Sequence, residues 1–296
     1  MPLFANLRKL LALALLLCSA TLHAADHAET EQVKVRLIAE RNLALPGSDV
    51  LIGLEQRIIP HWHTYWQNPG DSGMPTSIAW TLPAGASAGP IQWPVPTRQK
   101  QGALTNFGYA GSALLLTSIH IPANAKAGNE FPVTAKASWL VCEEICIPQQ
   151  AELTLTLKIV APGTRLPAAN PAISAARTAL PKEAPWAAST VRGKDTLQLR
   201  IASPELAAQK FEEIWFYPLK WGKLDHGAPQ SVSRDGDALL LTLHYGEAPP
   251  TADESLEGLL VVSEKSADGV LAHGFNLRAA PASTAPAAAT SEGATD

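Results

Sequence analysis

Cysteine is scarce in this sequence, with three residues in a chain of 296. Cys18 lies in the first apolar run, so only Cys142 and Cys146 would remain if that run were removed during export. This scarcity excludes a disulfide-rich scaffold, because such domains depend on several crosslinks. Any thiol chemistry of the exported chain must therefore rest on Cys142 and Cys146.

Long apolar runs are also few. The run at residues 10–17 follows two basic residues and is about half as long as a membrane-spanning helix requires. Small residues follow it before the sequence becomes polar. This arrangement predicts a signal peptide over residues 1–24, cleaved near Ala24 or Ala25, and an exported chain.

Positive charge is not in excess, since 23 Lys and Arg accompany 27 Asp and Glu. Removal of the leader takes away Arg8 and Lys9 and increases the acidic excess. A basic surface of the kind that binds nucleic acid is therefore not expected, and no nucleic-acid partner is predicted.

Between residues 31 and 160, no stretch shows helical periodicity over enough residues to indicate a helix. The pattern there is short runs of Val, Ile, Leu, Thr and Trp, broken by Pro, Gly, Asn and Asp. Val33, Val35 and Leu37 alternate with polar neighbours, as in a half-buried strand. Runs at such intervals are typical of β-sandwiches, so the fold class is expected to be all-β.

The domain organisation follows from shifts in composition. After residue 160 the sequence is rich in Ala and is interrupted by several Pro residues. These prolines allow only a short helix, around residues 173–180. A second set of strand patterns follows without cysteine, and it includes predicted strands at residues 196–202 and 213–218. The expected division is a signal peptide (1–24), a first β domain (26–160), a connector (161–186), a second β domain (187–279) and a disordered Ala/Pro-rich tail (280–296).

Cys142 and Cys146 lie where one predicted strand ends and the next begins. In a continued strand their Cα atoms would be roughly 13 Å apart, which a disulfide cannot span. The chain is therefore expected to turn at residues 143–145 and to carry both sulfurs at a loop tip. Closing so short a loop stabilises the fold by only about 2 kcal/mol. The spacing favours an exchange-active pair, with a structural disulfide and a metal site as alternatives.

A segment rich in aromatic and histidine residues begins at Pro60. In a strand, His61 and His63 would share one face, and with the cysteines and Met74 they could bind copper(I) or zinc. The alternative is that the aromatic side chains fill a sandwich core while the histidines satisfy turn carbonyls. The pattern favours this second interpretation, because two histidines alone are weak evidence for a metal.

Several motifs carry a resemblance to a known family. They are Trp62-His63-Thr64-Tyr65-Trp66, Asn68-Pro69-Gly70-Asp71-Ser72-Gly73, Asn106-Phe107-Gly108-Tyr109 and Trp139-Leu140-Val141-Cys142 with Cys146-Ile147-Pro148. Over roughly residues 30 to 160 the sequence resembles the amino-terminal periplasmic region of the DsbD/ScsB group of thiol:disulfide interchange proteins. The second β unit fits the two-domain arrangement of the ScsB-type subgroup more loosely.

This resemblance implies two immunoglobulin-like β-sandwich domains in tandem, located in the periplasm. It implies that Cys142 and Cys146 are the redox pair and that an aromatic cap loop shields their disulfide. The matching stretch offers Phe107 or Tyr109 as the shield. The remaining aromatic residues of the motifs are expected as structural neighbours of the site: Trp62, Tyr65, Trp66 and Trp139.

The resemblance also implies partners. Full-length members continue into a membrane-embedded electron carrier and a thioredoxin-like domain, whereas this sequence stops at Asp296 with neither. The chain is therefore expected to need a separate membrane partner and to serve periplasmic thioredoxin-fold oxidoreductases, without a cofactor.

The resulting hypothesis is a thiol–disulfide oxidoreductase of the protein-disulfide reductase type, which relays electrons through Cys142 and Cys146. By analogy, Cys146 is the better candidate for the client-facing sulfur. The rival is a periplasmic module for copper binding and copper tolerance that uses the cysteines and His61 or His63.

Overall fold

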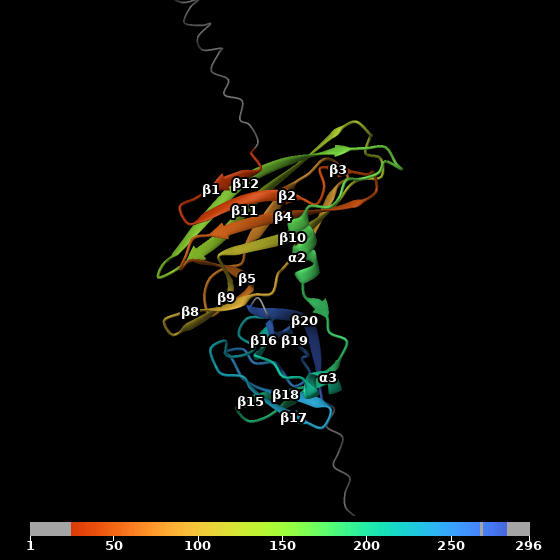
Figure 1. The fold of residues 1–296 in the computed structure, drawn as a ribbon. Helices are drawn as coiled ribbons and strands as arrows, with labels where there is room; N and C mark the ends of the chain where they lie inside the picture. The colour runs from red at the N-terminus through yellow and green to blue at the C-terminus, as the bar shows by residue number, and fades with distance from the viewer. Residues whose placement is uncertain (1–24, 267–268, 283–296) are drawn as a thin grey trace, which may run out of the picture.

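The computed structural model describes residues 25–266 and 269–282. It is mostly β and contains three sheets (Figure 1). The N-terminal region, residues 25–160, forms two of them, and the C-terminal region, residues 182–282, forms the third. The predicted all-β class is confirmed at this level. The predicted signal peptide lies outside the described residues.

The first sheet has five strands in the order β1-β2-β4-β10-β7. Their bounds are β1 (His27–Glu29), β2 (Val33–Ala39), β4 (Asp49–Ile58), β7 (Ser87–Gln92) and β10 (Ser112–His120). Strand β2 alternates buried and exposed residues over its first five positions, as the sequence predicts. That alternation directs one row of side chains toward the second sheet.

The second sheet has seven strands, with β3-β12-β11-β5-β9-β8 in order and β6 paired to β11. Their bounds are β3 (Leu43–Ala44), β5 (His63–Gly70), β6 (Ser77–Thr81), β8 (Thr97–Gln101), β9 (Leu104–Ala110), β11 (Glu130–Cys142) and β12 (Cys146–Ile159). Strands β11 and β12 form a long hairpin that ends at the two cysteines.

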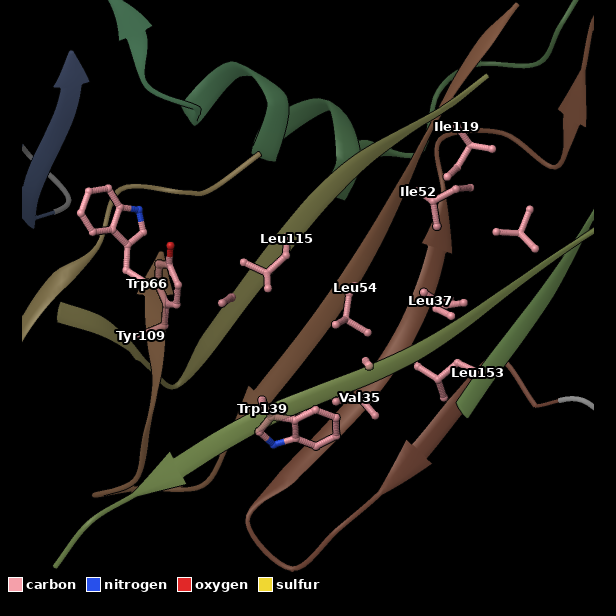
Figure 2. Close-up of a cluster of buried hydrophobic side chains, with 14 of the residues drawn as sticks. Val35, Leu37, Ile52, Leu54, Trp66, Tyr109, Leu115, Ile119, Trp139 and Leu153 are labelled. Atoms are coloured by element: carbon pink, nitrogen blue, oxygen red, sulfur yellow. The ribbon is translucent and has the colours of Figure 1, made fainter. Parts of the chain in front are cut away.

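The hydrophobic core of the N-terminal region lies between these two sheets (Figure 2). Val35, Leu54 and Leu115 project into it from the first sheet, and Trp139 and Leu153 from the second. All five side chains are nearly inaccessible to water. Burial of such side chains contributes roughly 1.5–3 kcal/mol each, so this layer holds the hairpin in place.

A short connector links the two regions. It contains helix α2 (Pro171–Ala179), which begins with Asn170 accepting a hydrogen bond from the amide of Ala172. Ile173 is the buried residue of this helix and packs with Ile38 and Leu116 on the first sheet. The short helix expected around residues 173–180 is confirmed.

The third sheet has eight strands, with β16-β19-β20-β14-β15-β18-β17 in order and β13 paired to β20. Their bounds are β13 (Lys182–Glu183), β14 (Ala187–Arg192), β15 (Thr196–Ala202), β16 (Glu213–Pro218), β17 (Ser231–Asp235), β18 (Ala238–His244), β19 (Leu256–Ser266) and β20 (Gly269–Pro281). Helix α3 (Pro204–Ala208) follows β15.

The end of β20 corrects the expected start of the tail. Ala280 and Pro281 pair with Ser189 and Thr190 of β14, and the amide of Ala282 donates to the carbonyl of Thr190. A parallel partner strand satisfies this backbone, which composition alone could not indicate. The rest of the predicted tail lies outside the described residues. Within residues 25–266 and 269–282, no helix is long and apolar enough to cross a membrane.

The C-terminal region packs against one end of the N-terminal region. Strands β16, β19 and β20 lie next to β5 and β9 in Figure 1. Trp215, Tyr217, Leu259 and Val261 belong to the same core cluster as the residues between the first two sheets. The apolar core is therefore continuous from one region to the other.

Candidate active site

The hairpin of β11 and β12 carries the candidate site at its tip. Its register is continuous from Glu130 opposite Lys158 to Cys142 opposite Cys146. Residues 143–145 make the turn, and the amide of Glu143 donates to the carbonyl of Ile145. The predicted turn is therefore confirmed, and the cysteines are the last pair of the ladder.

The two cysteines form a disulfide, with Cα atoms 4.2 Å apart. That spacing is near the value for directly opposed residues in an antiparallel pair. Cys142 is completely buried, whereas Cys146 is exposed. Glu143 and Glu144 in the turn are also exposed, and Ile145 is 66% exposed. A reactant from solution therefore meets Cys146 first, beside two carboxylates.

His63 lies beside the buried cysteine. It is the first residue of β5 and pairs directly with Cys142 across the sheet. Its side chain is almost fully buried, and its Nε2 atom has no hydrogen-bond partner. Burial lowers the pKa of His63 below its ordinary value of 6.5. The imidazole next to Cys142 is therefore neutral near pH 7.

Tyr65 contacts the exposed cysteine. Its hydroxyl oxygen lies 3.6 Å from the Sγ atom of Cys146, and its ring meets that of His63 edge to face at 5.1 Å. Burial raises the pKa of Tyr65, and a hydrogen bond with the Ser72 side chain lowers it in part. The hydroxyl therefore stays protonated at neutral pH and can serve as a donor.

The expected shielding by Phe107 or Tyr109 does not match the placement of these residues. Residues 104–110 form strand β9, in which Ala110 pairs with His63 and Tyr109 with Thr64. Because side chains alternate across a strand, Phe107 and Tyr109 lie on the face opposite to Cys142. Both belong to the hydrophobic core, and the Tyr109 hydroxyl donates to the carbonyl of Pro94. The aromatic contact to the sulfur comes from Tyr65.

The other aromatic residues of the motifs support the site from the core. Trp66 and Trp139 are core members, and Trp62 packs against that core as a partly buried residue. Trp139 also donates from its indole nitrogen to Gln149 at 3.1 Å. A groove of about 610 Å³ runs beside the hairpin, lined mainly by apolar residues that include Met74 and Leu140.

The histidines do not form the shared face that the sequence suggested. His61 is exposed and lies in a turn with φ of 72°, before β5 begins at His63. A turn breaks the alternation of a strand, so the two imidazoles are directed differently. Among residues 25–266 and 269–282, no three His, Cys, Asp or Glu side chains are placed to hold a metal ion.

Sequence reasoning missed the residues that link Tyr65 to the rest of the molecule. The sequence patterns gave Asp71 and Ser72 no individual role, but Ser72 lowers the pKa of Tyr65 and Asp71 lies 2.8 Å from His226 Nδ1. The closeness of Asp71 to Tyr65 along the chain was the available signal. Nothing in the sequence around His226 indicated a contact 155 residues away.

The N-terminal region is a two-sheet β domain with a partly exposed disulfide at a hairpin tip, an arrangement that permits thiol–disulfide exchange. Comparison with known families agrees with this chemistry. Residues 34–158 match the family described as "Thiol:disulfide interchange protein DsbD, N-terminal", so this part of the chain is similar to that family. The predicted family resemblance is confirmed.

Solved structures give the fold of nearly the whole chain. The N-terminal periplasmic domain of ScsB from Proteus mirabilis matches with a TM-score of 0.62 and 17% identity, over 86% of this chain and 97% of that one. The pilin subunit BcpA of Bacillus cereus matches with a TM-score of only 0.26 and 8% identity, over 83% and 67%. The first match supports a shared fold, and the second is too weak to support any argument. No curated protein matches the sequence.

Proposed function

We propose that this chain is a periplasmic thiol–disulfide exchange module. It relays electrons through Cys142 and Cys146 between a thioredoxin-like or membrane reductase partner and client oxidoreductases of the thioredoxin fold. The observation that carries the proposal is the unequal exposure of the pair, with Cys146 open to solvent and Cys142 buried. The match of residues 34–158 to the DsbD N-terminal family supports it.

The exposure of the sulfurs defines an order of steps. A partner thiolate attacks Cys146 Sγ, the disulfide breaks, and Cys142 leaves with the electron pair and takes up a proton. The partner's second thiolate then attacks the partner sulfur that is bonded to Cys146. The mixed disulfide breaks, and Cys146 is released as a thiolate. Two electrons have then passed from the partner dithiol, which becomes a disulfide, to Cys142 and Cys146. The reduced pair passes them to a client disulfide by the same steps.

The surroundings of the pair favour selective rather than general reactivity. Cys142 is buried, and the carboxylates of Glu143 and Glu144 adjoin it at the tip. Burial and neighbouring negative charge both disfavour a thiolate, so the reduced pair attacks poorly until a partner docks. The apolar groove beside the hairpin offers surface for such docking.

The domain arrangement is part of the proposal. We infer two immunoglobulin-like sandwiches in tandem, over residues 26–160 and 187–279, joined by the connector 161–186. Two facing sheets in the N-terminal region and a third sheet in the C-terminal region support this division. We infer that a membrane-embedded electron carrier or its thioredoxin-like domain supplies the electrons.

The first experiment is to measure the reduction potential of the pair. Mature protein is equilibrated in graded thiol buffers and its free thiols are counted. A value between about −120 and −270 mV supports the relay, because exchange-active pairs fall in that range. A value well below about −300 mV would identify a structural disulfide and overturn the proposal.

Single cysteine variants test the order of attack. Cys142→Ser leaves the exposed sulfur without a resolving thiol, so it should accumulate a mixed disulfide with a thioredoxin-fold partner. Cys146→Ser leaves only the buried thiol and should trap far less. The double variant is the control. If neither single variant traps any periplasmic thioredoxin-fold protein, the relay is excluded.

A further inference from the structure

The C-terminal region contacts the segment that follows Tyr65. The Asn68 side-chain amide donates to the carbonyl of Pro218 at 2.7 Å. His226 Nδ1 lies 2.8 Å from a carboxylate oxygen of Asp71. Both partners come from the C-terminal region, which contains no cysteine. Residues 68–71 are therefore held from outside the N-terminal region.

The His226–Asp71 contact is buried and specific. The His226 side chain is 3% exposed, and its ring packs edge to face against Phe107 at 5.1 Å. Its Nε2 atom is buried without a hydrogen-bond partner, so Nδ1 carries the polar contact of this ring. Phe107 packs in turn on Tyr217 at 4.9 Å. The imidazole is therefore fixed in orientation by packing on its ring and by one hydrogen bond.

The same segment is also tied to strand β9. The second carboxylate oxygen of Asp71 accepts from the Thr105 amide at 2.6 Å. Asn106 Oδ1 accepts from both the amide and the hydroxyl of Ser72, at 3.0 and 3.1 Å. Asp71 thus joins β9 to the C-terminal region, and Ser72 follows it directly.

Ser72 and Gly73 reach the redox site. The Ser72 side chain is near enough to the Tyr65 hydroxyl to lower its pKa, and that hydroxyl lies 3.6 Å from Cys146 Sγ. Gly73 lies so close to the Tyr65 ring that an added Cβ atom would be 2.2 Å from its Cε1 atom. Contacts therefore run without a break from His226 through Asp71, Ser72 and Tyr65 to the exposed sulfur.

We propose that the C-terminal region positions Tyr65, the side chain in contact with the exposed sulfur, with His226 as the positioning residue. By holding Asp71, His226 keeps Ser72 and Gly73 against Tyr65, and Tyr65 then restricts the approach of a thiol to Cys146 Sγ on the side that it contacts. This inference rests on the proposed exchange function and gives the cysteine-free region a role in it. The region controls how readily a thiol reaches Cys146, in addition to any role as a spacer.

The test measures the rate at which dithiothreitol reduces the oxidised protein. His226→Phe keeps a ring against Phe107 but removes the hydrogen bond, so Tyr65 should loosen and the rate should rise about tenfold, the factor that corresponds to 1.4 kcal/mol. His226→Asn restores a donor near the position of Nδ1 and should return the rate toward that of the wild type. The matched control is His244→Phe, at an exposed histidine of β18.

A double-mutant cycle separates positioning from general loosening of the fold. Tyr65→Phe should raise the rate by itself, and His226→Phe should add nothing in that background, because both act through the Tyr65 hydroxyl. Additive effects, or an unchanged rate in His226→Phe, would overturn the inference. If His226→Phe does not fold, Asp71→Ala removes the acceptor of the same contact at a side chain that is 29% exposed.

These outcomes are independent of the proposed relay. The rates use a small thiol and need no protein partner, whereas the relay depends on a mixed disulfide with a thioredoxin-fold protein. A coupled change in rate without any trapped partner would support positioning and exclude the relay. Trapping of a partner, together with additive effects of the two substitutions on the rate, would support the relay and exclude positioning.

Discussion

At the scale of single residues, the environment of His63 gives a measurable consequence. The imidazole is buried beside Cys142, and burial lowers its pKa from 6.5. In the unfolded chain the same group titrates near its ordinary value. Between the two pKa values the unfolded state binds more protons, so the free energy of unfolding must fall as the pH falls.

We predict that His63→Phe removes this part of the pH dependence. The wild type should lose stability as pH falls from about 6.5 to the lowered pKa of His63, by about 1.4 kcal/mol for each pH unit between those two values. Urea unfolding between pH 7.5 and 4.5 measures it. The difference between wild type and variant should change across that window, whereas exposed His244→Phe should leave the slope intact. A pH-independent difference for His63→Phe would contradict the prediction.

Individual residues also show which features of the site could be predicted from the sequence. Cys142 and Cys146 were identified because cysteine is rare and their spacing requires a turn. Phe107 and Tyr109 were assigned to the wrong neighbours, because the face of a strand depends on its register. The glycine-rich sequence around Phe107 and Tyr109 did not allow this register to be predicted. Tyr65 was named only as a neighbour, although it makes the contact to the sulfur.

At the scale of elements, the site depends on how β5 fits between β9 and β11. Strand β5 pairs with β9 at His63, Thr64 and Tyr65, and the register shifts before Gly70. It meets β11 only through His63 and Cys142. Residues 71–76 follow this shift and connect β5 to β6, which continues the pairing with β11. The interrupted pairing leaves room for the segment that contacts Tyr65.

We predict that Gly108→Ala disrupts this element. A Cβ atom at Gly108 would lie 1.9 Å from the carbonyl oxygen of Thr64, so the backbones of β5 and β9 must separate. The expected loss of stability in urea unfolding is about 1–3 kcal/mol. Gly89→Ala is the matched control, since its Cβ atom would meet only ordinary contacts at 3.5 Å. Equal stability of the two variants would argue against this account.

The elements themselves were largely predictable. Strands β15 (Thr196–Ala202) and β16 (Glu213–Pro218) have the predicted bounds, because their apolar runs are flanked by turn residues. The end of β20 was not predictable, since Ala280 and Pro281 have little strand propensity and depend on pairing with β14. His61 was placed in a strand, but a left-handed turn conformation separates it from β5.

At the scale of the whole molecule, one apolar core joins the two regions. Tyr217 of β16 packs edge to face on Trp66 and Phe107 of the N-terminal region. Burial raises the pKa of Tyr217 to about 12, in agreement with a dry contact. A hydrophobic contact of this kind couples the stability of the regions, unlike the polar interfaces of independently moving domains.

We predict that Tyr217→Ala destabilises both regions together. Loss of the buried ring should cost about 3–5 kcal/mol and lower the midpoint of one shared thermal transition. Scanning calorimetry measures both quantities. Trp221→Ala, at a side chain that is 51% exposed, serves as the control and should change stability by at most about 0.5 kcal/mol. Two separate transitions, with only one of them shifted, would show that the regions unfold independently.

The sequence by itself determined the all-β class, most strands, the hairpin turn and the two cysteines. These features depend on local patterns of alternation, turn residues and residue rarity, which act over a few positions. The tertiary structure decided which aromatic side chain contacts the sulfur, that Cys142 is buried while Cys146 is exposed, and that His226 reaches Asp71. Strand register and the packing of distant segments fix these contacts, and no short stretch of sequence encodes either one.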